Sequence, residues 1–233
     1  LIVGGTSGIG FYLSKKLAKS NNVSVLGRNK QVLKNLKLSG INSINFDLRE
    51  LNKTNSVFKN VNKKFGKLDA LIFSAGIQNI KPFKLINEKE IDDMIKINFQ
   101  SVMIFASFFA KNLYSNKNSI FLAISSSADT KPEKGIVAYS AVKAGLSMFV
   151  RALSLEIAPR RAIALSPGWL DTEMTQKFPY IYDKSFKIKY SASAPMGIAS
   201  LKDIHDIILF LISNKSKFLN GETIPFDGGA KYC

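Results

Sequence analysis

A glycine-rich loop at the start of the chain constrains the fold more than any other segment. The loop runs Val3-Gly4-Gly5-Thr6-Ser7-Gly8-Ile9-Gly10, directly after an apolar start, and an amphipathic pattern follows it. Strand, glycine-rich turn and helix in this order are typical of a dinucleotide site, where a helix N-terminus favours a pyrophosphate. The spacing is G-x-x-x-G-x-G rather than G-x-G-x-x-G, so the loop alone leaves an ordinary turn open.

Apolar runs and amphipathic segments alternate along the rest of the chain. We expect strands at 1–3, 23–26, 41–46, 68–73, 119–124, 162–166 and 222–226. We expect helices at 9–19, 29–38, 50–64, 87–113, 138–157 and 202–213, with Asn87 and Glu90 forming a capping box. Continuous apolar strands are typical of parallel sheets covered on both faces. The order predicts a single α/β domain over 1–233, a Rossmann-type doubly wound parallel sheet of about seven strands.

A second signal lies in the middle of the chain, where Tyr139 follows Ser126 by thirteen residues and precedes Lys143 by four. In a helix, a four-residue step places the phenol and the ammonium on one face. A positive charge near a phenol favours the phenolate, so we expect a lowered Tyr139 pKa and general acid–base chemistry. Ser126 could bind the same substrate oxygen. A Y-x-x-x-K pattern also recurs by chance in lysine-rich chains, so the glycine loop is needed to support it.

Together these elements resemble the short-chain dehydrogenase/reductase family from Leu1 to about Gly229. The family's glycine motif is matched by Gly4, Gly8 and Gly10. Further matches are Ala75-Gly76, Pro167-Gly168-Trp169-Leu170-Asp171-Thr172 and Gly221-Glu222-Thr223-Ile224-Pro225-Phe226-Asp227-Gly228-Gly229. The resemblance implies reversible hydride transfer between a nicotinamide and a small-molecule carbonyl or secondary alcohol.

The resemblance also implies a catalytic tetrad of Asn98, Ser126, Tyr139 and Lys143. Tyr139 would act as general acid and base, and Lys143 would lower its pKa and bind the nicotinamide ribose. Ser126 would polarise the substrate oxygen. Asn98 would hold a water in a proton relay, although it could equally be a kink residue within a helix, since Asn is a mediocre helix former.

The cofactor site implied by the resemblance extends over several loops. Its residues are Gly4, Thr6, Ser7, Gly8, Ile9, Gly10, Arg28, Asp47, Leu48, Ser74, Ala75, Gly76, Tyr139, Lys143, Pro167, Gly168, Leu170 and Thr172. Arg28 follows the second strand where an acidic residue would select NAD, so its guanidinium predicts NADP, with NAD less favoured. A solvated Arg28 is the alternative, and Ser7 lacks the second positive charge common in NADP enzymes. Asp47 would bind the adenine or cap a helix.

Two departures from the family pattern concern the centre of the sheet. Phe73-Ser74 stands where the family has two asparagines, so we expect Phe73 to be packed and Ser74 to keep a hydrogen bond. The 158–167 stretch is shorter than in the family, so either its strand is short or residues are missing. The abrupt start within the first strand fits the second alternative.

Composition narrows the class of protein. Hydrophobic residues make up 46% of the chain, and no uninterrupted apolar stretch is long enough to cross a bilayer. The single Cys233 excludes an internal disulfide, so we expect a cytoplasmic protein without membrane attachment. Neighbours of the lone His205 suggest neither a metal site nor a hydrolase triad, so no metal is expected.

The net charge of +16 comes mostly from dispersed lysines rather than from a dense basic cluster with interleaved aromatics. This pattern is typical of solvated faces, so we expect no nucleic-acid partner. An attraction for phosphorylated or acidic substrates remains open.

Substrate and partners are predicted less directly. The 173–196 segment is expected to form a variable lid with aromatic and lysine side chains. Similarity to 3-oxoacyl-[acyl-carrier-protein] reductases suggests an acyl thioester, with Lys117 and Arg160 placed where those enzymes bind the carrier; sugar, polyol or other carbonyl reduction is the alternative. A non-catalytic NADP(H) sensor stays possible. A homodimer or homotetramer is expected through helices 87–113 and 138–157, whose apolar residues include Phe105, Phe108, Phe109, Met148 and Phe149.

Overall fold

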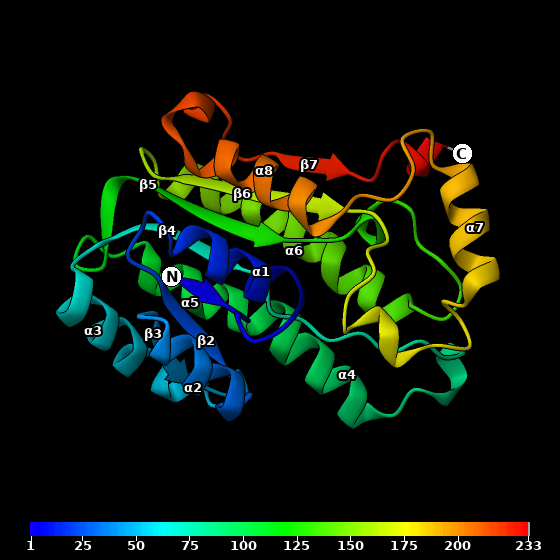
Figure 1. The fold of residues 1–233 in the computed structure, drawn as a ribbon, viewed down its shortest axis with the longest axis horizontal. Coiled ribbons are helices and arrows are strands. Elements are labelled where there is room, and N and C mark those ends of the chain that lie inside the picture. The colour runs from blue at the N-terminus through cyan, green and yellow to red at the C-terminus, as the bar shows by residue number, and fades with distance from the viewer. Residues whose placement is uncertain (233) are drawn as a thin grey trace.

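Seven parallel strands form the central layer of the molecule, in the order β3-β2-β1-β4-β5-β6-β7 (Figure 1). The computed structural model describes residues 1–232, so the prediction that concerns Cys233 lies outside the described residues. The strands are β1 Ile2–Val3, β2 Ser24–Gly27, β3 Asn42–Asn45, β4 Leu68–Phe73, β5 Ser115–Ile124, β6 Arg161–Pro167 and β7 Thr223–Phe226. The strand order reverses between β1 and β4, and in such sheets ligands bind outside the carboxyl ends at this point.

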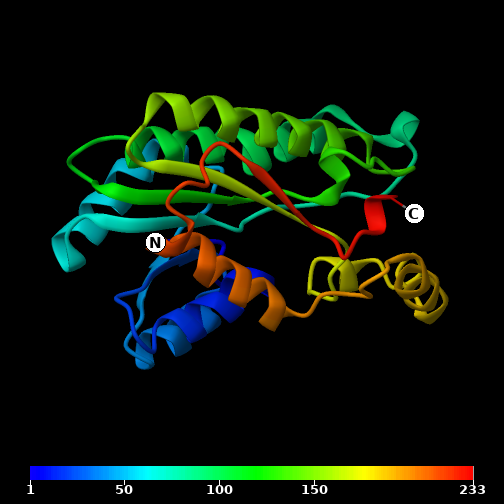
Figure 2. The ribbon, with the colours of Figure 1, turned by 90° about the horizontal axis from the view of Figure 1, so that it is seen from above.

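Helices cover both faces of the sheet, as Figure 2 shows with α6 on one side and α1 and α8 on the other. One face carries α1 Gly8–Leu17, α2 Lys30–Leu38 and α8 Leu201–Ile212. The other carries α3 Thr54–Phe65, α5 Ser101–Phe109 and α6 Val137–Glu156. Two further helices, α4 Glu88–Ile95 and α7 Lys184–Ser193, extend beyond the carboxyl ends of the strands.

Alternation along the strands separates two cores. Ile2 and Ile72 point toward α1 and α8, whereas Val3 and Phe73 point toward α5. The α5 side is aromatic, with Phe73 packed edge-to-face on Phe105 at 5.7 Å between ring centroids. Burying each such side chain contributes about 1.5–3 kcal/mol. Phe73 is 2% exposed, which confirms that it packs in the core.

The predicted strands are all present, and the Asn87–Glu90 capping box is confirmed. The predicted helix 87–113 is wrong as one regular helix, because the five-residue π-helical turn Lys96–Gln100 separates α4 from α5. The strand in the 158–167 stretch is not short, since β6 has seven residues and the chain turns from α6 to β6 between Glu156 and Arg161.

Helix α7 is absent from the prediction, because its apolar residues do not follow a clear helical stripe. Its N-cap was visible in the sequence: the Asp183 carboxylate accepts a hydrogen bond of 2.7 Å from the Phe186 backbone N–H. Across residues 1–232, none of the helices combines the length and apolar character that crossing a membrane requires.

Candidate active site

A cavity of about 270 Å³ opens at the carboxyl ends of β1 to β6. Most of the residues predicted to bind a cofactor line it: Gly4, Thr6, Ser7, Gly8, Ile9, Arg28, Asp47, Leu48, Ser74, Ala75, Gly76, Tyr139, Lys143, Pro167, Gly168, Leu170 and Thr172. Ser126 lines it too. Of the predicted site residues, Gly10 and Asn98 are not part of its wall.

Gly10 acts through packing rather than by facing the cavity. A Cβ at Gly10 would lie 2.3 Å from the Gly4 carbonyl oxygen and 2.4 Å from the Ser74 hydroxyl. Ser74 is fixed there by donating a 3.0 Å hydrogen bond to the Val3 carbonyl, which confirms the expectation that it keeps a hydrogen bond. Gly4 has a φ of +87°, and a Cβ there would lie 2.6 Å from the Ala75 backbone. The loop therefore needs glycine at both positions, and its backbone stays open to a ligand.

Asn98 sits in the π-helical turn and holds the loop that follows β4. Its amide oxygen accepts from the Ile77 N–H at 2.8 Å, and its amide nitrogen donates to the Ile77 carbonyl at 2.7 Å. Asn98 is 1% exposed. Asn98 thus lies at an irregularity between two helices, and such π turns often occur at functional sites.

Ser126, Tyr139 and Lys143 converge on the inner wall of the cavity. Ser126 follows β5 and lies close enough to the Tyr139 side chain to act on its pKa. Tyr139 and Lys143 lie on one face of α6, with the Lys143 Nζ 5.6 Å from the centroid of the Tyr139 ring. The Lys143 Nζ donates a 2.8 Å hydrogen bond to the Ile124 carbonyl. A phenol and a hydroxyl are therefore presented together to the cavity.

The pKa of the tyrosine differs from the sequence-based expectation. Burial raises the pKa of Tyr139 to about 12, against a smaller lowering by the Ser126 hydrogen bond. Burial also lowers the pKa of Lys143 to about 8. The expectation of a lowered Tyr139 pKa is wrong in this structure, because desolvation of the phenolate, with the charges of Tyr182 and Asp129, outweighs the lowering by Ser126. At neutral pH Tyr139 is a phenol and can donate a proton.

A carboxylate behind this group was missed in the sequence. Asp129 accepts hydrogen bonds from Ser147 at 2.6 Å, Ser125 at 3.1 Å and Ser166 at 3.2 Å. The three hydroxyls belong to α6, the end of β5 and β6. Asp129 therefore fixes the turn that carries Ser126 against the helix that carries Tyr139. Only the fold brings the serines together, so spacing gave no signal.

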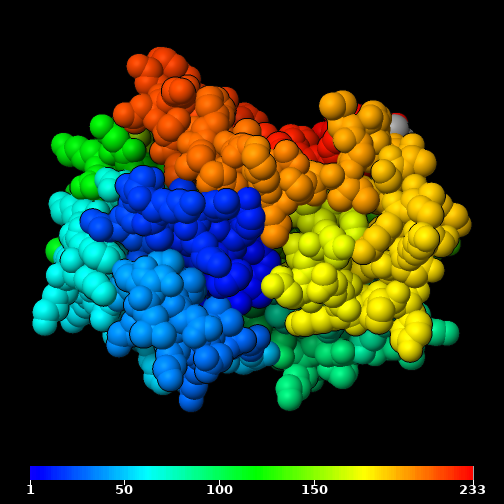
Figure 3. All heavy atoms as spheres, viewed as in Figure 1, coloured from blue at the N-terminus to red at the C-terminus, as the bar shows by residue number. Residues whose placement is uncertain are grey.

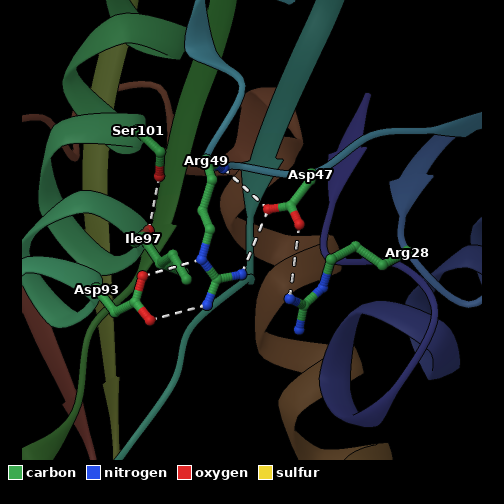
Figure 4. Close-up of polar contacts among 6 residues, drawn as sticks. All are labelled: Arg28, Asp47, Arg49, Asp93, Ile97 and Ser101. Carbon is green, nitrogen blue, oxygen red and sulfur yellow. Dashed lines mark hydrogen bonds and ion pairs between the residues drawn. The ribbon is translucent and has the colours of Figure 1, made fainter. Parts of the chain in front are cut away.

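At the other end of the cavity, beside Arg28, ion pairs link four side chains in a row. They are Arg28, Asp47, Arg49 and Asp93, which Figure 4 draws. Arg28 lies 3.8 Å from Asp47, and Asp47 accepts a 2.9 Å hydrogen bond from the Arg49 N–H. Arg49 in turn makes two hydrogen bonds to Asp93, at 2.9 and 3.0 Å. Asp47 thus closes a turn after β3, whereas the N-cap of the short helix that follows is Glu50, so the predicted helix-capping role is wrong. The Arg28 side chain is 59% exposed, so its long contact with Asp47 leaves the guanidinium accessible.

The 173–196 segment closes one side of the cavity. Figure 3 shows the yellow residues that follow β6 lying against the blue N-terminal residues, where the Glu173 carboxylate accepts a 2.8 Å hydrogen bond from the Gly8 N–H. Trp169 packs against three α7-region rings, Tyr182, Phe186 and Tyr190, at centroid distances of 5.8, 5.5 and 6.1 Å. All four rings line the cavity. The sequence suggested such aromatics but not their contact with Trp169.

Arg160 does not present the surface charge that was expected of a carrier-binding residue. It is 6% exposed and donates hydrogen bonds to the Ser115 hydroxyl at 2.7 Å and to the Asn112 side-chain oxygen at 2.6 Å. The guanidinium fastens the connection between α6 and β6 to the start of β5, so that part of the hypothesis is wrong. Lys117 is exposed, as expected.

The predicted apolar surface of the long helices is smaller than expected. Phe105 and Phe109 are fully buried within the chain, and Phe108 stacks on Phe58 at 5.2 Å. Phe149 is partly buried against Phe99. Met148 stays exposed, with 59% of its surface accessible. The core on this face of the sheet takes up most of the aromatics.

Comparison with known proteins identifies relatives along the whole chain. Residues 1–180 match the family model described as short chain dehydrogenase. The 3-oxoacyl-[acyl-carrier-protein] reductase FabG of Buchnera aphidicola subsp. Baizongia pistaciae is 32% identical, over 98% of this chain and 95% of the relative.

Solved structures share the fold. A 3-ketoacyl-(acyl-carrier-protein) reductase from Brucella melitensis, complexed with NADH, has a TM-score of 0.85 at 24% identity, covering 99% of this chain and 96% of its own. A gluconate 5-dehydrogenase from Burkholderia cenocepacia, in complex with NADP and tartrate, has a TM-score of 0.89 at 22% identity, covering 100% and 94%.

Proposed function

The chain belongs to the short-chain dehydrogenase/reductase family of NAD(P)-dependent oxidoreductases, and we propose that it interconverts a carbonyl and a secondary alcohol with NADP(H), using Tyr139 as general acid and base. The observation that carries this proposal is that Ser126 and Tyr139 line the same cavity wall, with Lys143 one helical turn from Tyr139. We further propose that residues 1–233 form one domain in which the 173–196 segment is the substrate lid.

The residues at the end of β1 fit a dinucleotide. Gly4 and Gly10 allow the loop to pack against Ala75 and Ser74 without a Cβ in the way, and the N-terminus of α1 offers backbone N–H groups. The cofactor would be held by the 4–10 loop, by 74–76, by 167–172, by Arg28 with Asp47 and Leu48, and by Tyr139 and Lys143. When bound, the nicotinamide supplies or accepts the hydride.

The side chains of this chain supply the proton chemistry. In reduction, the neutral Tyr139 phenol donates its proton to the carbonyl oxygen as negative charge develops there. The Ser126 hydroxyl donates a hydrogen bond to the same oxygen and polarises the carbonyl. Lys143 lies beside the phenol, where its charge favours the phenolate that remains. Asn98 holds the loop beyond β4, and its part in a water relay stays a prediction.

Arg28 is proposed to select NADP(H), because its accessible guanidinium can pair with a 2′-phosphate. Arg28→Ala should weaken NADPH binding about 10- to 100-fold, the loss expected for charge-assisted hydrogen bonds, and should leave NADH binding nearly unchanged. Fluorescence titration measures both dissociation constants. Arg151→Ala, which removes an exposed arginine on α6, is the control. Equal losses for the two cofactors would contradict the assignment.

Glu173 is expected to oppose cofactor binding. Its carboxylate occupies the Gly8 N–H at the α1 N-terminus, where a pyrophosphate is favoured, and two anions there repel each other. Glu173→Gln should therefore tighten binding of NADPH and NADH alike, by about 3- to 10-fold, a modest electrostatic gain at a partly solvated site. The same titration measures it, with Glu222→Gln as control. Weaker binding in Glu173→Gln would show that the carboxylate helps instead.

A 3-oxoacyl thioester is the proposed substrate, supported by the name of the Buchnera relative and by the aromatic wall of the cavity. Sugar, polyol or other small carbonyl reduction is the alternative. We also propose a homodimer or homotetramer through α4–α5 and α6, where Met148 remains exposed. Light scattering tests this, and a monomeric mass would overturn it.

The function is tested by titrating NADPH and NADH and then following oxidation of the cofactor at 340 nm with a panel of carbonyls that includes a 3-oxoacyl thioester. NADPH-selective binding with turnover supports the proposal. Binding without turnover on any carbonyl would favour the NADP(H) sensor instead. The sensor hypothesis drew on Phe73, and that side chain packs on Phe105 in the core rather than in the cavity wall.

A further inference from the structure

The charges along the cavity wall are unevenly placed. Among the described lining residues, the ionisable acids and bases other than tyrosine are Arg28, Asp47, Glu133, Lys143 and Glu173. Arg28 and Asp47 pair with each other at the ends of β2 and β3, and Glu173 bonds to the Gly8 N–H. Lys143 donates to the Ile124 carbonyl beneath Tyr139. Glu133 is the remaining charge, and it lies in the connection between Ser126 and Tyr139.

Glu133 faces the aromatic side of the cavity. The negative charge of its carboxylate adds to burial in raising the pKa of Tyr182, and it acts in the same direction on Tyr190. Both rings line the cavity beside Trp169 and Phe186. Glu133 therefore lies close to the space in which a substrate held by Ser126 and Tyr139 would extend.

The Glu133 carboxylate is also available. Within residues 1–232 it has neither an ion pair nor a side-chain hydrogen bond, although it is flanked by lysines. Lys131 donates to the Ala230 carbonyl at 2.6 Å, and Lys134 does not belong to the cavity wall. The lysines of the 173–196 segment are absent from the described wall as well, and Lys187 pairs with Asp171 at 2.6 Å. The lid lysines therefore give no sign of attracting an anionic substrate.

We propose that Glu133 is a specificity-determining residue that rejects substrates with a carboxylate near the reacting carbonyl and accepts a hydrogen bond from uncharged ones. The inference rests on the proposed function for the position of the carbonyl at Ser126 and Tyr139. Glu133 is exposed at the edge of the cavity, so a carboxylate next to it would meet a like charge that water screens in part, and the repulsion is modest. An ester, thioester or amide of the same skeleton carries no such charge, and an N–H or O–H on it can donate to Glu133.

Trp169 makes the proposal testable without turnover. It is the single tryptophan of the chain and lines the cavity, so its fluorescence reports binding there directly. The probes are ethyl acetoacetate and acetoacetate, which share a 3-oxo group and differ in the charge at C1. Each is titrated in the presence of NADP⁺, which cannot reduce a ketone, into the unmodified protein and into Glu133→Gln, Glu133→Lys and the control Glu156→Gln, an exposed carboxylate at the end of α6.

The ester should bind the unmodified protein more tightly than the acid. Glu133→Gln should reduce that preference about 2- to 5-fold by improving acid binding, and Glu133→Lys should reduce it further, as expected for removing and then reversing one exposed charge. Glu156→Gln should leave it unchanged. The proposal would be overturned if the ratio of the acid's to the ester's dissociation constant were equal in all four proteins. It would also be overturned if neither probe changed the fluorescence.

The outcome is separable from that of the proposed function. Discrimination by Trp169 fluorescence without oxidation of NADPH would support the role of Glu133 while the proposed function failed. If both probes were turned over and Glu133→Gln did not alter the ratio of their dissociation constants, the proposed reductase function would stand. Glu133 would then have no role in its specificity.

Discussion

Tyr139→Phe should lower the turnover number by at least the 10²- to 10⁴-fold that general acid–base catalysis contributes. The change removes the phenol hydroxyl near Ser126 and leaves the ring, which is 7% exposed and packed at the start of α6. Steady-state NADPH oxidation measures the effect. Because the ring stays, NADPH affinity and thermal stability should change little.

The control for this substitution is Tyr180→Phe, which removes a hydroxyl from a side chain that is 97% exposed. It should leave turnover unchanged. Near-normal turnover in Tyr139→Phe would show that another group donates the proton, and the proposed role of Tyr139 would be abandoned. A fall in turnover accompanied by a large fall in melting temperature would instead indicate a structural role.

Lys143→Met should abolish turnover and change how stability depends on pH. The lysine is 4% exposed, and burial lowers its pKa from 10.5 to about 8 in the folded chain. Between these values the unfolded chain binds more protons than the folded one, so stability rises with pH across this window. The difference corresponds to about 3 kcal/mol, from about 1.4 kcal/mol per pKa unit.

Compared with Lys143→Met, the unmodified protein should therefore gain about 3 kcal/mol of unfolding free energy between pH 7.5 and 10.5, by the same conversion. Taking the difference cancels the tyrosines, whose raised pKa values act in the opposite sense above pH 10. At pH 7, Lys143→Met stabilises the folded chain by removing a buried charge. It also removes the hydrogen bond to the Ile124 carbonyl, which offsets about 1–3 kcal/mol of that gain. Denaturant unfolding measures both proteins. Unfolding free energies that change with pH in parallel in the two proteins would contradict the lowered pKa of Lys143.

The sequence predicted elements whose signal is local. Apolar runs located the seven strands, because a parallel strand covered on both faces needs them. The glycine loop predicted the turn into α1, since only glycine tolerates the close approach to the backbone at Gly4. The four-residue step from Tyr139 to Lys143 placed both on one face of α6, because helical geometry is fixed by spacing.

Contacts between segments far apart in the chain could not be predicted from the sequence of the site residues. Asp129 reaches serines on three elements, and Glu173 reaches Gly8 from 165 residues away, so spacing carries no trace of either contact. Helix α7 was missed for a related reason: its rings pack on Trp169 rather than forming a regular stripe.

What the sequence determined by itself is therefore the order of the elements and the residues placed at the strand ends, because periodicity and turn chemistry act over a few residues. The tertiary structure decided the state of these residues. Burial raised the Tyr139 pKa where the neighbouring lysine predicted a lowering, and it enclosed Arg160 and Phe105, which the sequence had placed at a surface. Desolvation depends on everything that surrounds a group, and only the folded chain brings those surroundings together.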